Sequence, residues 1–121
     1  MSAVAWIGVA VLGGVGALAR FLLDGAVAAR AGRELPFGTL TVNVAGAFLL
    51  GFLTGVSLRG DALVLAGGAT LGSFTTFSTW MFETQRLAEE GAGAGAAGNV
   101  AISLAVGLGA VALGRLVGSH L

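Results

Sequence analysis

Gly72-Ser73-Phe74-Thr75-Thr76-Phe77-Ser78-Thr79-Trp80 is the segment that decides the fold, because it places five hydroxyl groups and three aromatic rings inside the apolar stretch 62–87. A membrane-spanning helix needs about 20 mostly apolar residues, and this segment falls near the middle of such a stretch. Polar groups at that depth are tolerated where protein satisfies them or where they line a watery path. The segment therefore predicts a helix break or a polar track. The alternative is that each hydroxyl bonds back to the carbonyl four residues earlier.

The composition of the whole chain indicates an all-α membrane protein. Hydrophobic residues make up 56% of the 121 residues and charged residues only 10%, whereas a soluble domain carries about 25% charged residues. Four apolar stretches, at 4–23, 37–58, 62–87 and 97–117, occupy most of the chain. We therefore expect a single transmembrane domain over residues 1–121, with four membrane-spanning helices of which the third is broken near its middle.

Charge and cysteine content exclude several classes. No Lys or Arg precedes the first apolar stretch, so the N-terminus does not resemble a signal peptide. The chain has no cysteine, which excludes a disulfide framework and a thiolate metal site. The net charge of zero gives no sign of a nucleic-acid partner.

The linkers are expected to be short. We expect them at 24–35 and 59–61, with Pro36 opening the second helix. The Gly/Ala run 91–98 is either a flexible loop or a soft entry to the last helix.

Small residues recur at helix-contact spacing, which predicts close packing and oligomerisation in a bilayer, although a Gly/Ala-rich chain also produces such spacings by chance. These residues are Ala47, Gly51, Gly55, Ala101, Ala105, Gly109, Gly114 and Gly118. If the four spans alternate, Arg59 and Arg115 lie on one side of the membrane and the other four arginines on the opposite side. Such a weak bias fits insertion in both orientations, and it also fits a weakly biased single topology.

Three polar residues lie at positions from which lipid excludes polar groups. Arg20 either serves a pathway or snorkels its guanidinium to the interface. The amide of Asn43 either donates to a ligand or joins neighbouring helices. Glu83 shares a helix face with Trp80 and is either a pathway carboxylate or the start of a solvated helix end.

Several polar and aromatic residues of these spans offer many hydrogen-bond donors and positive ring edges and no carboxylate. They comprise Arg20, Asn43, Thr76, Phe77, Ser78, Thr79 and Trp80. Amide and hydroxyl hydrogens, a guanidinium and positive ring edges suit a small anion better than a cation. A hydrated anion crosses a bilayer only where donors replace its water shell, so this set predicts an anion path.

Three motifs follow one another along the chain. They are Gly13-Gly14-x-Gly16-Ala17-x-x-Arg20, Phe37-Gly38-Thr39-Leu40-x-Val42-Asn43-x-x-Gly46-x-Phe48-x-x-Gly51 and Gly72-x-x-Thr75-Thr76-Phe77-Ser78-Thr79. In order and spacing they resemble the Fluc (CrcB-type) fluoride channels over essentially the whole chain. The resemblance implies a fluoride-selective channel, not an enzyme, that exports F⁻ passively across the plasma (inner) membrane and lowers cytoplasmic fluoride. It also implies an antiparallel, dual-topology dimer with two pores, built as a homodimer or with a similar subunit in the lipid bilayer.

The resemblance also implies roles for individual residues. Asn43 matches the pore-lining asparagine, Phe77 the first of two pore phenylalanines and Arg20 the vestibule arginine. Ser78 and Thr79 match hydroxyls along the anion track, and Glu83 aligns with a polar position towards the pore end.

A buried sodium ion at the dimer centre is a further implication of the resemblance. By motif position, the carbonyls of Gly72 and Thr75 would hold this structural ion, once from each subunit. The chain departs from the family at Trp80, which stands for the second pore phenylalanine, and at Ser73, where glycine is frequent. An indole keeps a positive ring edge and adds an N–H donor, but its larger size narrows the path.

Two other functions compete with a channel. A small multidrug-resistance-type proton-coupled exporter also has four short helices, but it needs a carboxylate deep in the membrane. The first span has no acid, and Glu83 lies near the end of the third. A non-transporting assembly subunit would not require so dense a polar track.

Overall fold

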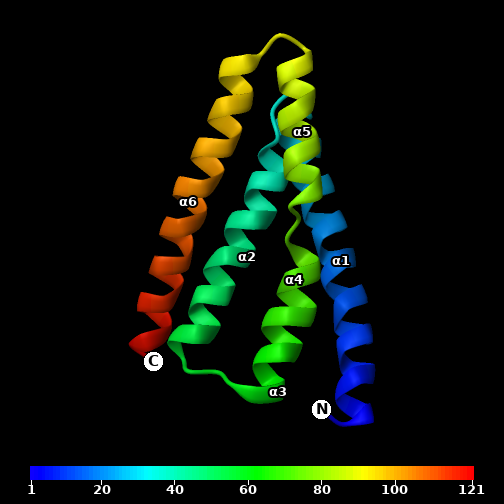
Figure 1. The fold of residues 1–121 in the computed structure, drawn as a ribbon, viewed down its shortest axis with the longest axis vertical. Coiled ribbons are helices and arrows are strands. Elements are labelled where there is room, and N and C mark those ends of the chain that lie inside the picture. The colour runs from blue at the N-terminus through cyan, green and yellow to red at the C-terminus, as the bar shows by residue number, and fades with distance from the viewer.

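Residues 1–121 form an all-helical chain in the computed structural model. The elements are α1 (Ala3–Ala31), α2 (Phe37–Gly55), α3 (Gly60–Leu63), η1 (Val64–Leu71), α4 (Gly72–Phe74), α5 (Ser78–Glu89) and α6 (Gly93–Ser119). Helices α3 to α5 follow one another along a single rod, so the chain makes four rods, with both termini at the same end (Figure 1). The predicted four-helix architecture with a broken third helix is therefore confirmed.

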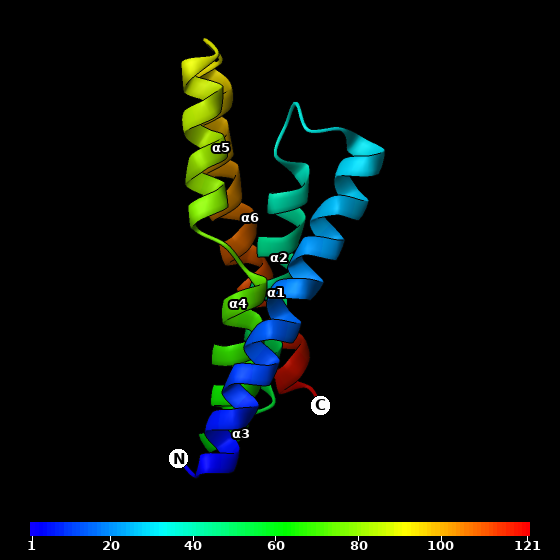
Figure 2. The ribbon, with the colours of Figure 1, turned by 90° about the vertical axis from the view of Figure 1, so that its right-hand side faces the viewer.

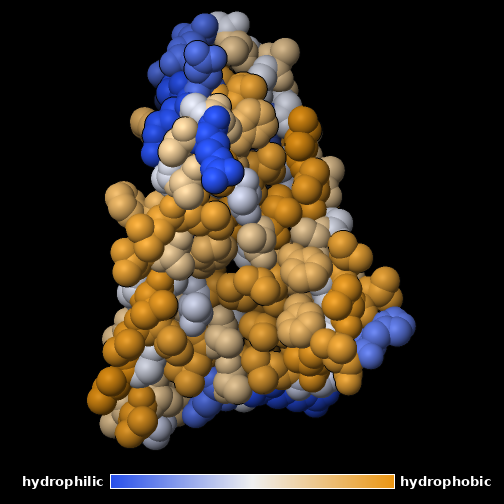
Figure 3. Space-filling model, turned by 180° about the vertical axis from the view of Figure 1, so that it is seen from behind, coloured by the Kyte–Doolittle hydropathy of each residue, from blue (hydrophilic) through white to orange (hydrophobic).

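The surface is that of a multi-pass membrane protein. Three helices, α1, α2 and α6, are long and apolar enough to cross a membrane. The fourth rod is the interrupted one. Figure 3 shows hydrophobic residues across the middle of the molecule and hydrophilic residues gathered at its two ends. This pattern places the middle of the rods in the hydrocarbon and both ends in water.

Several helix bounds differ from those that hydropathy predicts. Helix α1 continues through Ala31 and ends at Gly32, whose φ is 77°, because the alanine-rich segment 24–31 forms helix well even where its hydropathy falls. Helix α2 ends at Gly55, before the predicted 58. Helix α6 begins at Gly93, so the run 91–98 is a soft entry to the last helix and the loop alternative is wrong.

Glycines bring α2 and α6 into backbone contact. A Cβ added to Gly51 would lie 2.2 Å from the carbonyl oxygen of Val111, and one added to Gly114 would lie 2.0 Å from that of Phe48. No side chain fits there, so these glycines are required by the approach of the two helices. The other predicted stripe on α6 does not pack within the chain, since a Cβ on Gly109 would have no neighbour within 4 Å.

The third rod changes its helical form before it breaks. Over η1 the turns are wide, and the N–H of Gly72 donates to the carbonyl of Gly67, five residues earlier. Helix then stops at Phe74, and Thr75 is extended, with φ −82° and ψ 162°. Gly46 of α2 makes room for this bend, because a Cβ there would lie 2.2 Å from the Thr75 methyl group. Wide turns of this kind frequently accompany functional sites.

The halves of the molecule diverge beyond the break. In Figure 2, α5 and α6 lean to one side and the end of α1 with the start of α2 to the other. This divergence opens the polar end of the molecule, where the cavities described below are found.

Candidate functional site

A side-chain amide holds the break in the third rod. Asn43 donates from Nδ2 to the carbonyl of Thr76 (2.9 Å), and its Oδ1 accepts from the Thr76 N–H (2.8 Å). This paired contact satisfies backbone groups that the break removes from the helix, which a bilayer requires. One N–H of the Asn43 amide is not used by the pair, since a carboxamide has two. Asn43 therefore joins α2 to the break and leaves one amide N–H outside this pair.

The five hydroxyls of the deciding segment fall into two groups. Ser73 and Thr75 bond back to carbonyls four residues earlier, on Ala69 (2.7 Å) and Leu71 (3.0 Å). For these two residues, the alternative that the hydroxyl bonds back to its own helix is therefore right.

The remaining hydroxyls form a cluster at the start of α5. Thr76 Oγ1 donates to Thr79 Oγ1 (3.1 Å), accepts from the Thr79 N–H (3.2 Å) and lies 3.4 Å from Ser78 Oγ. Thr76 thus caps α5, as Ser and Thr do at helix starts. Ser78 and Thr79 are exposed on the surface of the single chain, whereas Thr76 is buried. The three form a continuous run of hydroxyls, which we call the hydroxyl track.

The break also frees two backbone carbonyls. In an uninterrupted helix, the N–H groups of Thr76 and Thr79 would donate to the carbonyls of Gly72 and Thr75. Here these N–H groups donate to Asn43 Oδ1 and to the Thr76 hydroxyl instead. The two carbonyls deprived of their helical donors are the pair at which the family resemblance implies a sodium ion.

Two polar cavities lie beside the hydroxyl track. The inner cavity, of about 210 Å³, is lined by Arg20, Phe21, Asp24, Thr39, Val42, Thr76 and Thr79. The outer cavity, of about 370 Å³, shares Asp24 and Thr79 with it and adds Arg33, Glu83 and Arg86 among others. Arg20 therefore lines a polar cavity together with Thr76 and Thr79 of the track.

Glu83 is tied into the subunit. The hydroxyl of Thr39, on α2, donates to Glu83 Oε1. Thr39 is itself buried and lines the inner cavity. The carboxylate thus lines the outer cavity and contacts a residue that lines the inner one.

The two predicted aromatic residues lie apart from these cavities. Phe77 and Trp80 meet edge to face, with ring centroids 5.7 Å apart and planes at 84°. Phe77 is 70% exposed, and neither ring lines the inner or outer cavity. The indole N–H of Trp80 donates to the carbonyl of Asn99 on α6 (3.3 Å). Within one chain, the predicted pore residues therefore form two groups on different sides of α5.

Sequence reasoning missed four polar residues of this region. Thr39 precedes Asn43 by one helical turn and Asp24 follows Arg20 by one turn, so the i, i+4 spacing was a usable signal for both. Thr84 follows Trp80 by one turn in the same way, whereas Asn99 had no such signal. Asn99 Nδ2 donates to Thr84 Oγ1 (2.9 Å), and that contact depends on which faces of α5 and α6 meet.

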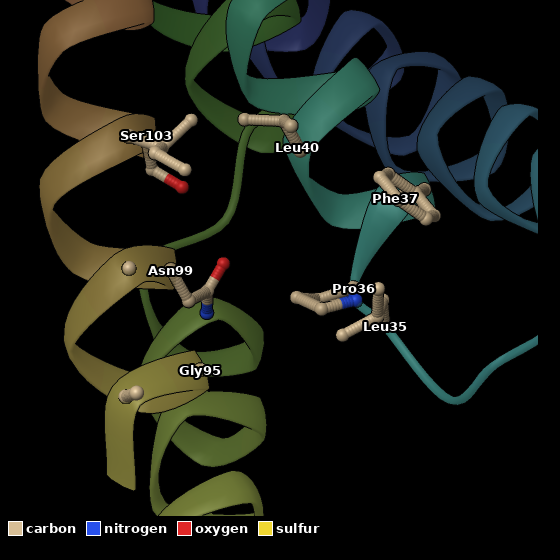
Figure 4. A pocket seen from close by; sticks show the side chains of 10 residues that line it. Leu35, Pro36, Phe37, Leu40, Gly95, Asn99 and Ser103 are labelled. Atoms are coloured by element: carbon tan, nitrogen blue, oxygen red, sulfur yellow. The ribbon is translucent and has the colours of Figure 1, made fainter. Parts of the chain in front are cut away.

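An apolar groove of about 330 Å³ separates the start of α2 from α6. Leu35, Pro36, Phe37 and Leu40 form one wall and Gly95, Asn99 and Ser103 the other (Figure 4). Asn99, whose carbonyl accepts from Trp80, also lines this groove. The Trp80 contact therefore lies next to an apolar surface that the chain itself does not cover.

Fold and site together define a membrane protein whose broken span carries a hydroxyl track between polar cavities. Residues 7–115 match the family described as CrcB-like protein, Camphor Resistance (CrcB). The chain is 52% identical over 112 residues to the fluoride-specific ion channel FluC 2 of Mycobacterium tuberculosis, with 93% of this chain and 89% of that protein aligned. It is 47% identical over 120 residues to the fluoride-specific ion channel FluC of Geobacter metallireducens, with 95% and 97% aligned. The chain belongs to the CrcB-like family, which confirms the resemblance read from its motifs.

Proposed function

We propose that this chain forms a fluoride-selective channel through which F⁻ leaves the cell passively. The observation that carries the proposal is the hydroxyl track beside a helix break whose backbone is held by Asn43. A small anion needs hydrogen-bond donors in place of its water shell. Family membership supports fluoride as that anion, because the relatives named above are fluoride-specific channels.

The donors belong to residues with compatible chemistry. The unused N–H of Asn43, the hydroxyls of Ser78 and Thr79 and the ring edge of Phe77 all present positive charge density to an anion. Arg20 supplies a full positive charge at the inner cavity. Passive conduction needs no chemical step, so the proposed protein is a channel and not an enzyme.

We further propose that a second copy, inverted in the membrane, completes the pathway. Ser78, Thr79 and Phe77 are exposed in the single chain, and lipid against hydroxyls and freed carbonyls is unfavourable. The stripe of Ala101, Ala105 and Gly109, which has no partner within the chain, also suits contact with another subunit. The weak arginine bias is compatible with inversion. The partner is a second copy of this chain or a similar subunit.

A structural sodium ion at the centre of that dimer is part of the proposal. The carbonyls of Gly72 and Thr75 fit a monovalent hard cation, because their helical donors are diverted and they supply neutral oxygen ligands. These two residues of each subunit would hold the ion, which would neutralise carbonyl dipoles that face one another.

The exporter alternative is not favoured. A proton-coupled exporter needs a carboxylate that exchanges protons deep in the membrane. Two acids lie near the break: Asp24 lines the inner cavity with Thr76, and Glu83 accepts from Thr39. Both lie in the diverging half of the molecule. No acidic side chain lies in the middle of any apolar stretch.

Fluoride efflux from liposomes that contain only the purified chain tests the proposal. We expect fluoride to leave much faster than from empty liposomes, while chloride stays inside. Efflux at the empty-liposome rate, with a folded dimer shown by crosslinking, would contradict a homodimeric channel. Recovery of efflux on adding a similar subunit would then identify the heteromeric form.

A further inference from the structure

Asp24 places a negative charge between the two cavities of the proposed anion path. It lines both the inner and the outer cavity. It follows Arg20 by four residues on α1, which puts both side chains on one helix face. Its Oδ2 also lies 3.5 Å from the guanidinium of Arg33. The carboxylate therefore sits next to two positive groups that would attract an anion.

The fold leaves room for this carboxylate beside α2. A Cβ added to Gly38, in the first turn of α2, would lie 1.9 Å from Asp24 Oδ1. The missing side chain at Gly38 thus makes the space that the carboxylate occupies. A helix start attracts negative charge, so the first turn of α2 favours the carboxylate at this place beside the cavities.

The charges around the outer cavity nearly cancel. Its lining includes two positive side chains, Arg33 and Arg86, and two negative ones, Asp24 and Glu83. Arg86 also donates to the backbone carbonyls of Arg33 and Glu34 (3.1 and 3.3 Å), which keeps this loop over α5. A cavity entrance whose charges cancel raises the local concentration of anions far less than an entrance with a net positive charge does.

We propose that Asp24 lowers the fluoride concentration at the mouth of the path by offsetting Arg33 and Arg20, and so limits conduction when ionic strength is low. The inference rests on the proposed channel function. The negative charge faces the arriving anion and partly neutralises the arginines that attract it. Salt weakens its effect, because the Debye length falls to about 3 Å at 1 M.

Asp24→Asn is the direct test, with fluoride efflux measured from liposomes at low and at high ionic strength. We expect about a threefold rise in flux at low ionic strength, which is smaller than the effect of a fully charged cleft because a single charge is removed, and no rise at high ionic strength. Glu89→Gln is the matched control. Glu89 is an exposed acid at the same end of the molecule and lines neither cavity, so its flux is expected to stay at the wild-type level.

Arg33→Gln keeps the test decisive if Asp24→Asn folds poorly. The Arg33 side chain is 70% exposed, so its loss is tolerated, and flux at low ionic strength is expected to fall by a similar factor. The double variant restores the wild-type charge sum and is expected to conduct like the wild type.

Fluoride efflux by the wild-type protein tests the channel function separately from the role of Asp24. Three results would overturn the role of Asp24. The first is that flux in Asp24→Asn is unchanged at both ionic strengths. The second is a change that persists at high salt, which points to packing. A double variant that conducts less than Arg33→Gln alone is the third, since it makes Asp24 an anchor for α2.

Discussion

The α2–α6 contact and the break of the third rod differ in how their backbone polar groups are satisfied within the bilayer. Along α2 and α6 the backbone hydrogen bonds stay within each helix, and glycines let the two backbones approach closely. A Cβ added to Gly51 or Gly114 would lie only 2.0–2.2 Å from a carbonyl oxygen of the other helix. At the break, backbone groups leave the helix and one amide side chain receives them. The first region supplies a rigid frame. The second places polar groups where a uniform helix would place none.

Gly114→Leu tests the frame and has the largest expected effect. The new side chain meets the backbone of α2, so the helices must separate at a cost of about 3 kcal/mol, the upper end of the usual range for overpacking. We expect the variant to lose its helical fold on heating well before the wild type, followed by circular dichroism in detergent. Gly107→Leu is the control on the same helix, because a Cβ there has no neighbour within 4 Å. Equal stability of the two variants would show that the close approach is not required.

Asn43→Asp tests the break itself. The carboxylate still accepts from the Thr76 N–H, but it cannot donate to the Thr76 carbonyl or to an anion. Repulsion between like charges about 4 Å apart amounts to about 4 kcal/mol at the effective dielectric of a protein surface, which corresponds to roughly a thousandfold lower flux. Near-wild-type fluoride efflux from liposomes would reduce Asn43 to a link between helices.

Sodium removal tests the two freed carbonyls. Without a cation, the Gly72 and Thr75 carbonyls of two subunits would face one another unpaired. We expect several-fold lower fluoride flux, and a less stable dimer, when sodium is replaced by a large organic cation during purification and assay. Function that is indifferent to the exchange, together with water-like contacts at the two-fold axis of an experimental structure, would contradict the proposed ion.

Trp80→Phe has the smallest expected effect, and it tests whether Trp80 contributes to helix packing or to the anion path. The indole N–H already donates to the Asn99 carbonyl, so an anion does not depend on it. We expect flux to be preserved or raised, because a phenyl ring keeps the edge polarity and removes bulk. A fall in flux with dimer stability intact would show that the N–H serves the anion. Trp80→Ala with wild-type flux would place the ring outside the path.

Much of this architecture is legible in the sequence because the bilayer imposes simple rules. Apolar stretches predict the rods, and the block of hydroxyls from Ser73 to Thr79 predicts the break. The contact from Thr39 to Glu83 and the one from Trp80 to Asn99 were not predictable in the same way. They depend on how α2, α5 and α6 are rotated about their axes. A single sequence rich in Gly and Ala leaves those rotations open, because small residues occur on every face.

The place of the two chain ends limits how this protein can be joined into larger polypeptides. Both termini lie at the same end of the four rods (Figure 1). A short peptide between two tandem copies would thus hold them in the same orientation. An inverted pair within one polypeptide would need a connecting segment that itself crosses the membrane. Reporters attached to the two ends, in contrast, should always be found on the same side, whichever way the chain inserts.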